Sequence, residues 1–579
     1  MNGLDKKALK AKFLELNEEV QKIFRDYLGF IITLFLLNFI TMAWSLMNED
    51  KIEVLFCYGF SLFFAVFLVA ALIKMVCRKT WLKETVKGFI LFISSIVFGI
   101  EFFTMYNYHT LIGTGIINSL FETNFREALE FLNMYVGATE IGSVAAFLAF
   151  FYFIRKRRLI DGVRSQPHFN KFVIGIFIVG LFYMIRMIYC YGEFFVDNQF
   201  LPFQRAYASA KVALKNIEAY DDLAGKMNAD IQLTENKSKI KNVVFILGES
   251  TNRNHMGAYG YYLPNTPNIQ RMRDAHELEL FTDVISPHST TIAVLSKLFT
   301  FCDFESDKEW YQYNNLIDIA KAAGYKTFWL SNQESSGIWG NVAQIFSQHS
   351  DKHEFTRIRE SREDYGIVDG ELLPLIDRAL METEEKNFFV IHLMGTHGLY
   401  YNRFPYAFSK FSKDDIKLEV NDEKKTIISQ YDNAVYYNDF IVNEIINKFR
   451  DKETVIVYVS DHGEAVYDEQ NFTGHIEENP NRHMIEVPML IWTSEQFKKQ
   501  YPEKVQHIVN STDNPYMTDD MIHTFLDIMD IKTPDYEPNR SIINEKFDIT
   551  RKRIFNERDY DCEIKNGVAV ESDVIQNKN

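Results

Sequence analysis

The first third of the chain alternates long apolar runs with short polar loops. Five runs have roughly the length that an α-helix needs to cross a bilayer, and they lie at 27–46, 54–76, 86–106, 134–154 and 172–189. The first run begins late and four more follow, so we expect a membrane anchor rather than a cleaved signal peptide. The pattern predicts a bundle of five transmembrane helices over residues 1–190.

Basic residues mark one side of this predicted bundle. They are frequent before the first run, between the second and third runs, and between the fourth and fifth, whereas the alternate loops at 48–53 and 107–133 are poorer in Lys and Arg. Loops on the cytoplasmic side carry such an excess. We therefore predict a multi-pass protein with a cytoplasmic N-terminus, in which everything after residue 189 lies on the outer side.

Three ionisable residues lie within or near the ends of the apolar runs. They are Glu101, Glu140 and Arg186. The predicted orientation puts all three towards the outer ends of their helices. They are either interfacial charges whose heads reach water or the lining of a cavity for a charged lipid head group. The sequence leaves both interpretations open.

Beyond residue 241 short strand-like runs alternate with helical patterns. The strand-like runs lie at 243–247, 327–330, 388–393, 454–459 and 489–492, and the helical patterns at 316–323, 370–381 and 429–449. This alternation predicts an α/β domain over 242–560 with a mostly parallel sheet that is covered on both faces. Residues 191–241 are predicted to be a linker with an interfacial or an ordinary connecting helix, and 561–579 a polar tail.

Composition narrows the choice of partner and compartment. The net charge of −16 argues against nucleic acid, and the 50 phenylalanines suit a surface that faces lipid. The five cysteines show no CxxC spacing, so neither a zinc finger nor a disulfide framework is predicted. A single bridge between Cys302 and Cys562 stays open.

Two of the predicted strands end at side chains that can bind a metal ion. Glu249 follows the run at 243–247, and Asp461 and His462 follow the run at 454–459. Functional groups gather beyond the carboxyl ends of strands in α/β domains, and a solitary buried carboxylate would be costly. Two carboxylates and one imidazole suit zinc with an open position. The alternative for Glu249 is a helix-capping role.

Further candidates lie in nearby loops. His397 and His475 follow apolar runs or short loops where a strand-end cluster would gather them, although each alone is typical of a surface histidine. Ser289, Thr290 and Thr291 precede an amphipathic run and mark the N-terminus of a helix, where backbone N–H groups favour a phosphoryl anion. One of these hydroxyls is a candidate nucleophile, or all are cap residues. Spacing does not choose among them.

Three motifs resemble those of bacterial phosphoethanolamine transferases, which are membrane members of the alkaline phosphatase/sulfatase superfamily. They are Gly-Glu-Ser-Thr-x-Arg-x-His-Met-x-x-Tyr-Gly-Tyr at 248–261, Gly-Thr-His-Gly at 395–398 and Ser-Asp-His-Gly-Glu at 460–464. Five spans before a periplasmic domain is also the layout of this family. The resemblance covers nearly the whole chain. It implies an alkaline phosphatase-like fold in a protein of the bacterial inner membrane, with the catalytic domain in the periplasm.

The resemblance also assigns roles to residues. The implied zinc site consists of Glu249, Thr291, Asp461 and His462. Thr291 is the implied nucleophile because its register to Phe301 matches the branch that modifies lipopolysaccharide core, and Thr290 is the runner-up. His397 and His475 are implied to bind a second metal ion or the phosphate.

The chain departs from the family pattern in places that concern the substrates. The outer loop keeps Thr123 and Glu127, which the resemblance assigns to the lipid donor, but Ser119 replaces the expected Asn, with Asn118 one place away. The Cys-Gly-Thr that many relatives have around the nucleophile is replaced by Pro-His-Ser-Thr-Thr at 287–291, and the segment 335–340 lacks the Lys of some relatives. These departures leave the acceptor open. The Cys/Ser-x-Pro-x-Arg motif of sulfatases is missing at the nucleophile, which disfavours sulfatase activity.

The resemblance implies a zinc-dependent transferase. Thr291 would attack phosphatidylethanolamine, release diacylglycerol, and pass phosphoethanolamine to an envelope glycan or lipid such as lipopolysaccharide core or lipid A. We expect a monomer with one tightly bound zinc ion and a second, weaker site. Two alternatives stay open: glycerol-phosphate transfer from phosphatidylglycerol, and a non-catalytic sensor that only binds glycolipid. Retention of every zinc-ligand position argues against the sensor.

Overall fold

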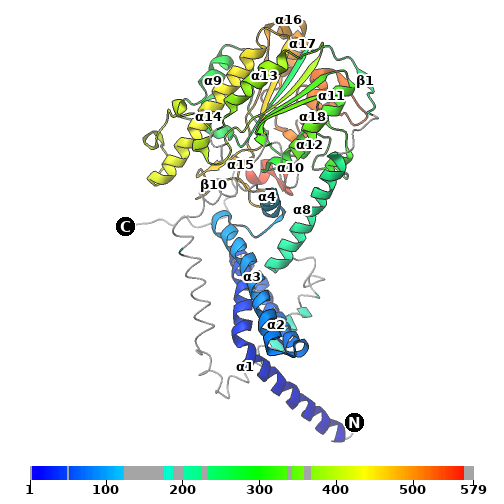
Figure 1. Cartoon of the computed structure of the whole chain (residues 1–579), viewed down its shortest axis with the longest axis vertical. Helices are drawn as coiled ribbons and strands as arrows, with labels where there is room; N and C mark the ends of the chain where they lie inside the picture. Colours follow the sequence, from blue (N-terminus) through cyan, green and yellow to red (C-terminus); the bar gives the residue numbers. More distant parts are fainter. Residues whose placement is uncertain are drawn as a thin grey trace. The chain divides into compact units, whose positions relative to one another are not determined.

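The computed structural model describes residues 3–48, 51–122, 201–224, 231–334, 342–357 and 367–565, with scattered residues between 142 and 189. Figure 1 labels its helices and strands. The chain forms two compact units. The first contains residues 1–118 and 132–213, and the second contains 119–131 and 214–579.

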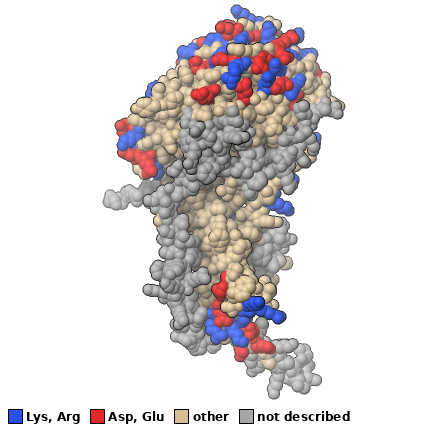
Figure 2. Space-filling model, viewed as in Figure 1, with Lys and Arg blue, Asp and Glu red and all other residues tan. Residues whose placement is uncertain are grey.

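The first unit contains three helices that are long and apolar enough to cross a membrane. They are α1 (Gly3–Asn48), α2 (Ile52–Val76) and α3 (Thr80–Tyr108), with the candidate span of α1 at Glu18–Asn48. Figure 2 shows these helices as a band without charged side chains, bounded at one end by Lys, Arg, Asp and Glu. The first three predicted runs lie in these helices. The predicted run at 134–154 lies outside the described residues, and that at 172–189 is described only in part.

A buried ion pair joins two elements of the first unit. Arg205, in the first turn of α8 (Pro202–Ala224), donates from Nε and Nη2 to Glu101 Oε1 at 2.8 and 2.6 Å. Thr41 of α1 donates to the other carboxylate oxygen. The Glu101 carboxylate is fully buried, so it is neither an interfacial charge in water nor a site for a lipid head group. Arg186 pairs instead with the exposed Glu53, and Glu140 lies outside the described residues.

The second unit is built on a seven-stranded sheet (Figure 1). Its strands, in spatial order, are β3 (Leu278–Phe281), β11 (Met489–Thr493), β8 (Thr454–Ser460), β2 (Asn242–Gly248), β7 (Asn387–His392), β5 (Lys326–Glu334) and β6 (Lys352–Arg357). From β8 to β6 every pairing is parallel, whereas β11 runs antiparallel to both of its neighbours. The sheet is therefore mixed. The five predicted strand-like runs all lie in it.

The central strands are apolar on both faces because helices cover both. Every residue of β2, β7 and β8 is buried, as expected for strands with no face in water. On one face Phe245 packs against Phe525 of α18 (Met521–Met529), with ring centroids 4.8 Å apart. On the other face Phe389 contacts Phe449 of α14 (Asp422–Phe449) at 5.3 Å.

The predicted helices form with small shifts in their bounds. They correspond to α11 (Leu316–Ala322), α13 (Leu372–Leu380) and α14. Helix α14 begins earlier than the apolar pattern predicts, because the Asn421 side chain accepts from the Lys424 N–H and caps its polar first turn. The start of the predicted polar tail is ordered in the structure. Asp561 pairs with Arg553, and Lys565 lies 2.7 Å from Asp283.

Removing one partner of the buried Arg205–Glu101 pair should be strongly destabilising. Arg205→Met should lower the thermal midpoint of the detergent-purified chain, at a cost of about 3–5 kcal/mol, because the carboxylate stays buried without its partner. Adding Glu101→Leu should recover most of the loss. Arg186→Met is the matched control, since the side chain of its partner Glu53 is 77% exposed and such pairs contribute only about 0–1 kcal/mol. Equal losses in the two single variants would contradict this account.

Candidate active site

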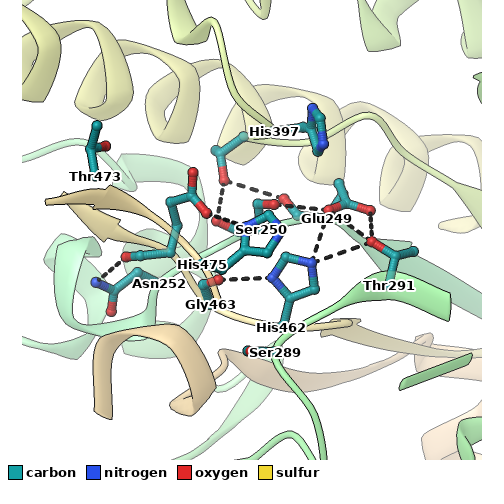
Figure 3. Close-up of polar contacts among 12 residues, drawn as sticks. Glu249, Ser250, Asn252, Ser289, Thr291, His397, His462, Gly463, Thr473 and His475 are labelled. Atoms are coloured by element: carbon teal, nitrogen blue, oxygen red, sulfur yellow. Dashed lines mark hydrogen bonds and ion pairs between the residues drawn. The ribbon is translucent and has the colours of Figure 1, made fainter. Parts of the chain in front are cut away.

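The carboxyl ends of β2 and β8 bring three metal-capable side chains together. The strands are paired up to Gly248 and Ser460, and the Asp461 N–H donates to the Gly248 carbonyl at 3.1 Å. Beyond these residues Glu249, Asp461 and His462 each offer a ligand atom, and these atoms all lie within 4.8 Å of one another. All three side chains are at most 1% exposed. Two distant segments of the sequence thus form one buried cluster, and Figure 3 shows two of its members, Glu249 and His462.

Thr291 directs its hydroxyl at this cluster. It is the first residue of α10 (Thr291–Leu298), and its Oγ1 lies 3.1 Å from Glu249 Oε2 and 3.3 Å from His462 Nε2 (Figure 3). Thr290 is the extended residue before the helix, and Ser289 bonds to Glu477. Of the three hydroxyl residues that the sequence leaves open, the structure therefore brings Thr291 to the metal-capable side chains.

The two carboxylates and the imidazole of the cluster shift one another's pKa values strongly. Burial by itself would lower the pKa of His462, but Asp461 and Glu249 raise that pKa to about 10. Burial and the charge of Glu249 raise the pKa of Asp461. Asp461 Oδ2 is buried and has no hydrogen-bond partner among the described residues. An orphaned carboxylate oxygen next to a second carboxylate and an imidazole is the donor set that suits a divalent cation such as zinc.

His462 is oriented for this task by its own loop. Its Nδ1 lies 2.8 Å from the Gly463 carbonyl, which can only accept, so this nitrogen donates and Nε2 is left for a cation. The carboxylate of Glu249 is held in a similar way. Ser250 Oγ donates to Oε1 at 2.8 Å and Gln333 Nε2 donates to Oε2 at 3.2 Å.

His397 and His475 lie beside the cluster. The rings of His462 and His475 are 4.1 Å apart between centroids, and those of His397 and His475 are 6.4 Å apart (Figure 3). Burial lowers the pKa of His397 to about 4, so its imidazole is neutral at physiological pH. His475 Nδ1 lies 2.6 Å from a carboxylate oxygen of Glu464. The two imidazoles can bind a second cation or a phosphoryl oxygen.

The sequence analysis did not identify several residues that support the site. Ser250 and Glu464 stand inside the motifs and could have been chosen from them, and Tyr400, whose hydroxyl donates to Glu464 at 2.7 Å, lies three residues after His397. Gln333 has no signal in the sequence, because only the parallel pairing of β5 with β7 brings it to Glu249.

The structure gives less information on the predicted donor-binding residues, but it decides whether the possible disulfide forms. Thr123 and Glu127 lie outside the described residues. Ser119 and Asn118 belong to α4 (Thr114–Glu122), and the donor-binding role of all four stays a prediction. Cys302 is buried and Cys562 exposed, and both are free thiols, so the bridge that the sequence left open does not form.

Comparison of the chain with models of known protein families identifies the family to which it belongs. A family model for sulfatases matches residues 241–531, half of the chain. The chain belongs to the sulfatase family. A second model, described as phosphoethanolamine transferase EptA/EptB, matches residues 62–215. The resemblance seen in the motifs is thereby confirmed.

Individual relatives agree with this placement. Phosphoethanolamine transferase EptC of Escherichia coli (strain K12) is 32% identical over 332 residues, which is 56% of each chain, so the chain spans little more than half the length of this relative. Phosphoethanolamine transferase EptA of Helicobacter pylori is 24% identical over 86% of this chain and 90% of that protein.

Two solved structures are similar to the chain. The periplasmic domain of EptC from Escherichia coli, in complex with zinc, is 30% identical, with a TM-score of 0.55 over 59% of this chain and 99% of that domain. The integral membrane protein EptA from Neisseria meningitidis shares the fold, with a TM-score of 0.64 over 89% of this chain and 97% of that protein at 20% identity.

A second buried cluster supports the loop that follows Glu249. His255 lies between Asp432 and Asp468, with Nδ1 and Nε2 at 3.0 and 2.8 Å from their carboxylates. Burial by itself would lower the pKa of His255, but the two carboxylates raise it to about 10. His255 holds the pKa of Asp468 well below its usual range, whereas deeper burial raises the pKa of Asp432. The imidazolium thus ties the β2 loop to α14.

The stabilisation by His255 should depend on pH. Its pKa rises from 6.5 to about 10 on folding, so the stabilisation is complete below pH 6.5 and is lost as the pH rises through 10. His255→Gln should therefore cost about 3–5 kcal/mol at pH 6 and much less at pH 10. Thermal unfolding of both proteins between these pH values measures the difference. A difference that stays constant with pH would show that His255 is not charged in the fold.

Proposed function

We propose that the chain is a zinc-dependent transferase that moves phosphoethanolamine from phosphatidylethanolamine to a glycan or lipid of the bacterial envelope. The observation that supports this most is the meeting of the Thr291 hydroxyl with Glu249 and His462 at 3.1–3.4 Å. A hydroxyl at that position is a nucleophile, because it lies next to groups that can take or compensate its proton. We infer that the transferred group is phosphoethanolamine because the relatives are named phosphoethanolamine transferases.

The residues of the chain would perform the reaction in two steps. In the first step Thr291 Oγ1 forms a bond to phosphorus, the bond from phosphorus to the glycerol oxygen breaks, and diacylglycerol leaves with a proton. In the second step an acceptor hydroxyl oxygen attacks the same phosphorus, the bond from phosphorus to the Thr291 oxygen breaks, and the acceptor's proton passes to that oxygen. The backbone N–H groups in the first turn of α10 would hold the phosphoryl oxygens, and the neutral His397 would contribute to binding them.

A zinc ion fits the donor set that Glu249, Thr291, Asp461 and His462 present. When bound, zinc would supply Lewis acidity and lower the pKa of the Thr291 hydroxyl, which is otherwise far above neutrality. Supporting this assignment, the periplasmic domain of the relative EptC was solved in complex with zinc. The neutral His397 and the Glu464-bound His475 suit a second, weaker site.

The membrane layout belongs to the same proposal. Five spans with a cytoplasmic N-terminus would put the catalytic domain in the periplasm, next to the outer leaflet from which the donor comes. Arg205 fixes the first turn of α8 to Glu101 in the candidate span α3. Phe203 and Tyr207, on the other side of that turn, are 55% and 65% exposed. Such aromatic side chains suit the membrane interface, which supports an interfacial α8.

The nucleophile can be identified by intact mass after incubation with phosphatidylethanolamine. Wild type and Thr290→Ala should gain one phosphoethanolamine group, whereas Thr291→Ala should gain none, because its hydroxyl is the one that reaches Glu249 and His462. A cap residue alone would change stability by about 1 kcal/mol and leave the adduct intact. Phosphatidylglycerol serves as the control donor. An adduct with this lipid alone would show glycerol-phosphate transfer instead of the proposed reaction. The absence of an adduct with either lipid would refute the proposal.

The metal ligands can be tested by elemental analysis. Asp461→Ala should lose the tightly bound zinc, because it removes the only buried carboxylate oxygen of the cluster that has no hydrogen-bond partner among the described residues. His397→Ala should keep this zinc and weaken only the second site. Zinc content that is undiminished in Asp461→Ala would contradict the assignment of the site.

A further inference from the structure

The segment that delivers Thr291 to the cluster is not fixed by its own helix cap. Thr290, the residue before α10, is extended at φ −130° and ψ 137°, and its side chain makes no capping hydrogen bond. Helix starts are usually fixed by such a bond. Ser286 and Ser289, earlier in the segment, are fully buried. Some other group must therefore set where the helix begins.

Glu477 is that group. Its carboxylate lies 2.6 Å from His288 Nδ1, and it accepts hydrogen bonds from the N–H and the Oγ of Ser289 at 2.9 and 3.2 Å. The Glu477 side chain is only 14% exposed. Three contacts from one largely buried carboxylate thus hold the two residues that precede Thr290.

The backbone of Glu477 is fixed as well. It stands two residues after His475, in the loop that follows β10 (Thr473–Gly474), and β10 pairs with β9 (Ala465–Val466) just after the His462 loop. Its carbonyl accepts from Asn556 Nδ2 at 3.2 Å. Glu477 therefore links the nucleophile segment to the β9–β10 hairpin, which His462 precedes and His475 follows.

We propose that Glu477 is a positioning residue for transfer, and that through Ser289 it sets the distance of the Thr291 hydroxyl from Glu249 and His462. This inference rests on the proposed function. Without the carboxylate, His288 and Ser289 lose these three contacts. Ser286 keeps its hydrogen bonds to Ile485 and His288, and none of the metal-capable side chains is altered. Because a displacement of about 1 Å can reduce a rate by about 100-fold, Glu477 should affect the rate of phosphoryl transfer rather than the binding of lipid or metal.

The test compares full-length Glu477→Ala, Glu477→Gln and Ser289→Ala with wild type. Measured are kcat and KM for phosphatidylethanolamine, zinc content and the thermal midpoint. Glu477→Ala should lower kcat by about 10- to 100-fold with KM and zinc content unchanged. Glu477→Gln should recover part of the rate, because its amide oxygen can still accept from the Ser289 N–H. Ser289→Ala, which keeps that N–H, should have the smallest effect.

A matched control comes from the same hairpin. Glu469 lies between β9 and β10 and pairs with Arg482 at 2.9 Å, so Glu469→Gln should keep the wild-type kcat. A wild-type kcat in Glu477→Ala would overturn the proposal. The proposal would also be overturned if both Glu477 variants lost zinc or thermal stability in proportion to their loss of rate. A rise in KM without a change in kcat would overturn it as well.

A readout that does not depend on activity separates this inference from the proposed function. If the wild type transfers phosphoethanolamine from no lipid, the proposed function is refuted. The effect of Glu477 on the position of Thr291 can still be measured, because the next readout needs no activity. With cobalt in place of zinc, the visible absorption reports the ligands around the ion. Glu477→Ala should shift this spectrum in the direction of Thr291→Ala, and Glu469→Gln should not. A Glu477→Ala spectrum identical to that of wild type would overturn the proposal.

Discussion

The compensation of buried negative charge is the constraint on which the second unit depends. Glu249 and Asp461 lie at the ends of two paired strands, each at most 1% exposed. Two carboxylates so close together cannot both stay ionised without a cation or protons. In the structure His462 provides part of this compensation, since its pKa is raised to about 10. A divalent cation would replace that proton, which is the role that we propose for zinc.

The loops around the site are shaped to allow this proximity. Ser250 adopts φ 57°, which lets its N–H donate to Asp461 while its hydroxyl donates to Glu249. A Cβ at Gly395, which has φ 52°, would meet the Glu249 carbonyl at 2.5 Å, and one at Gly463 would meet the His483 carbonyl at 2.2 Å. Backbone segments pass too close to the ligands for any side chain there, which explains why glycine stands in both motifs.

Sequence patterns predicted the parts of the fold whose causes are local. The apolar runs predicted α1 to α3 and five of the seven sheet strands, though not the edge strands β3 and β6, and the strand-end position of Glu249 and Asp461 indicated a shared site. What depends on pairing at a distance could not be predicted. The direction of β11, the approach of Gln333 through β5 and the burial of Glu101 against Arg205 each require the folded chain. The family resemblance favoured Thr291 over Thr290, but the residues alone left three hydroxyls open, and the position of Thr291 at the start of α10 separates it from its neighbours.

X-ray absorption at the zinc edge of the metal-loaded full chain tests the central claim most directly. The account predicts one imidazole nitrogen and oxygen ligands at about 2.0–2.2 Å, without sulfur. It also predicts that Thr291→Val removes one oxygen from this shell while Asp461 and Glu249 stay bound. A sulfur shell, two or more imidazoles at the tight site, or a shell that does not change in Thr291→Val would contradict the claim that Glu249, Thr291, Asp461 and His462 form one metal centre.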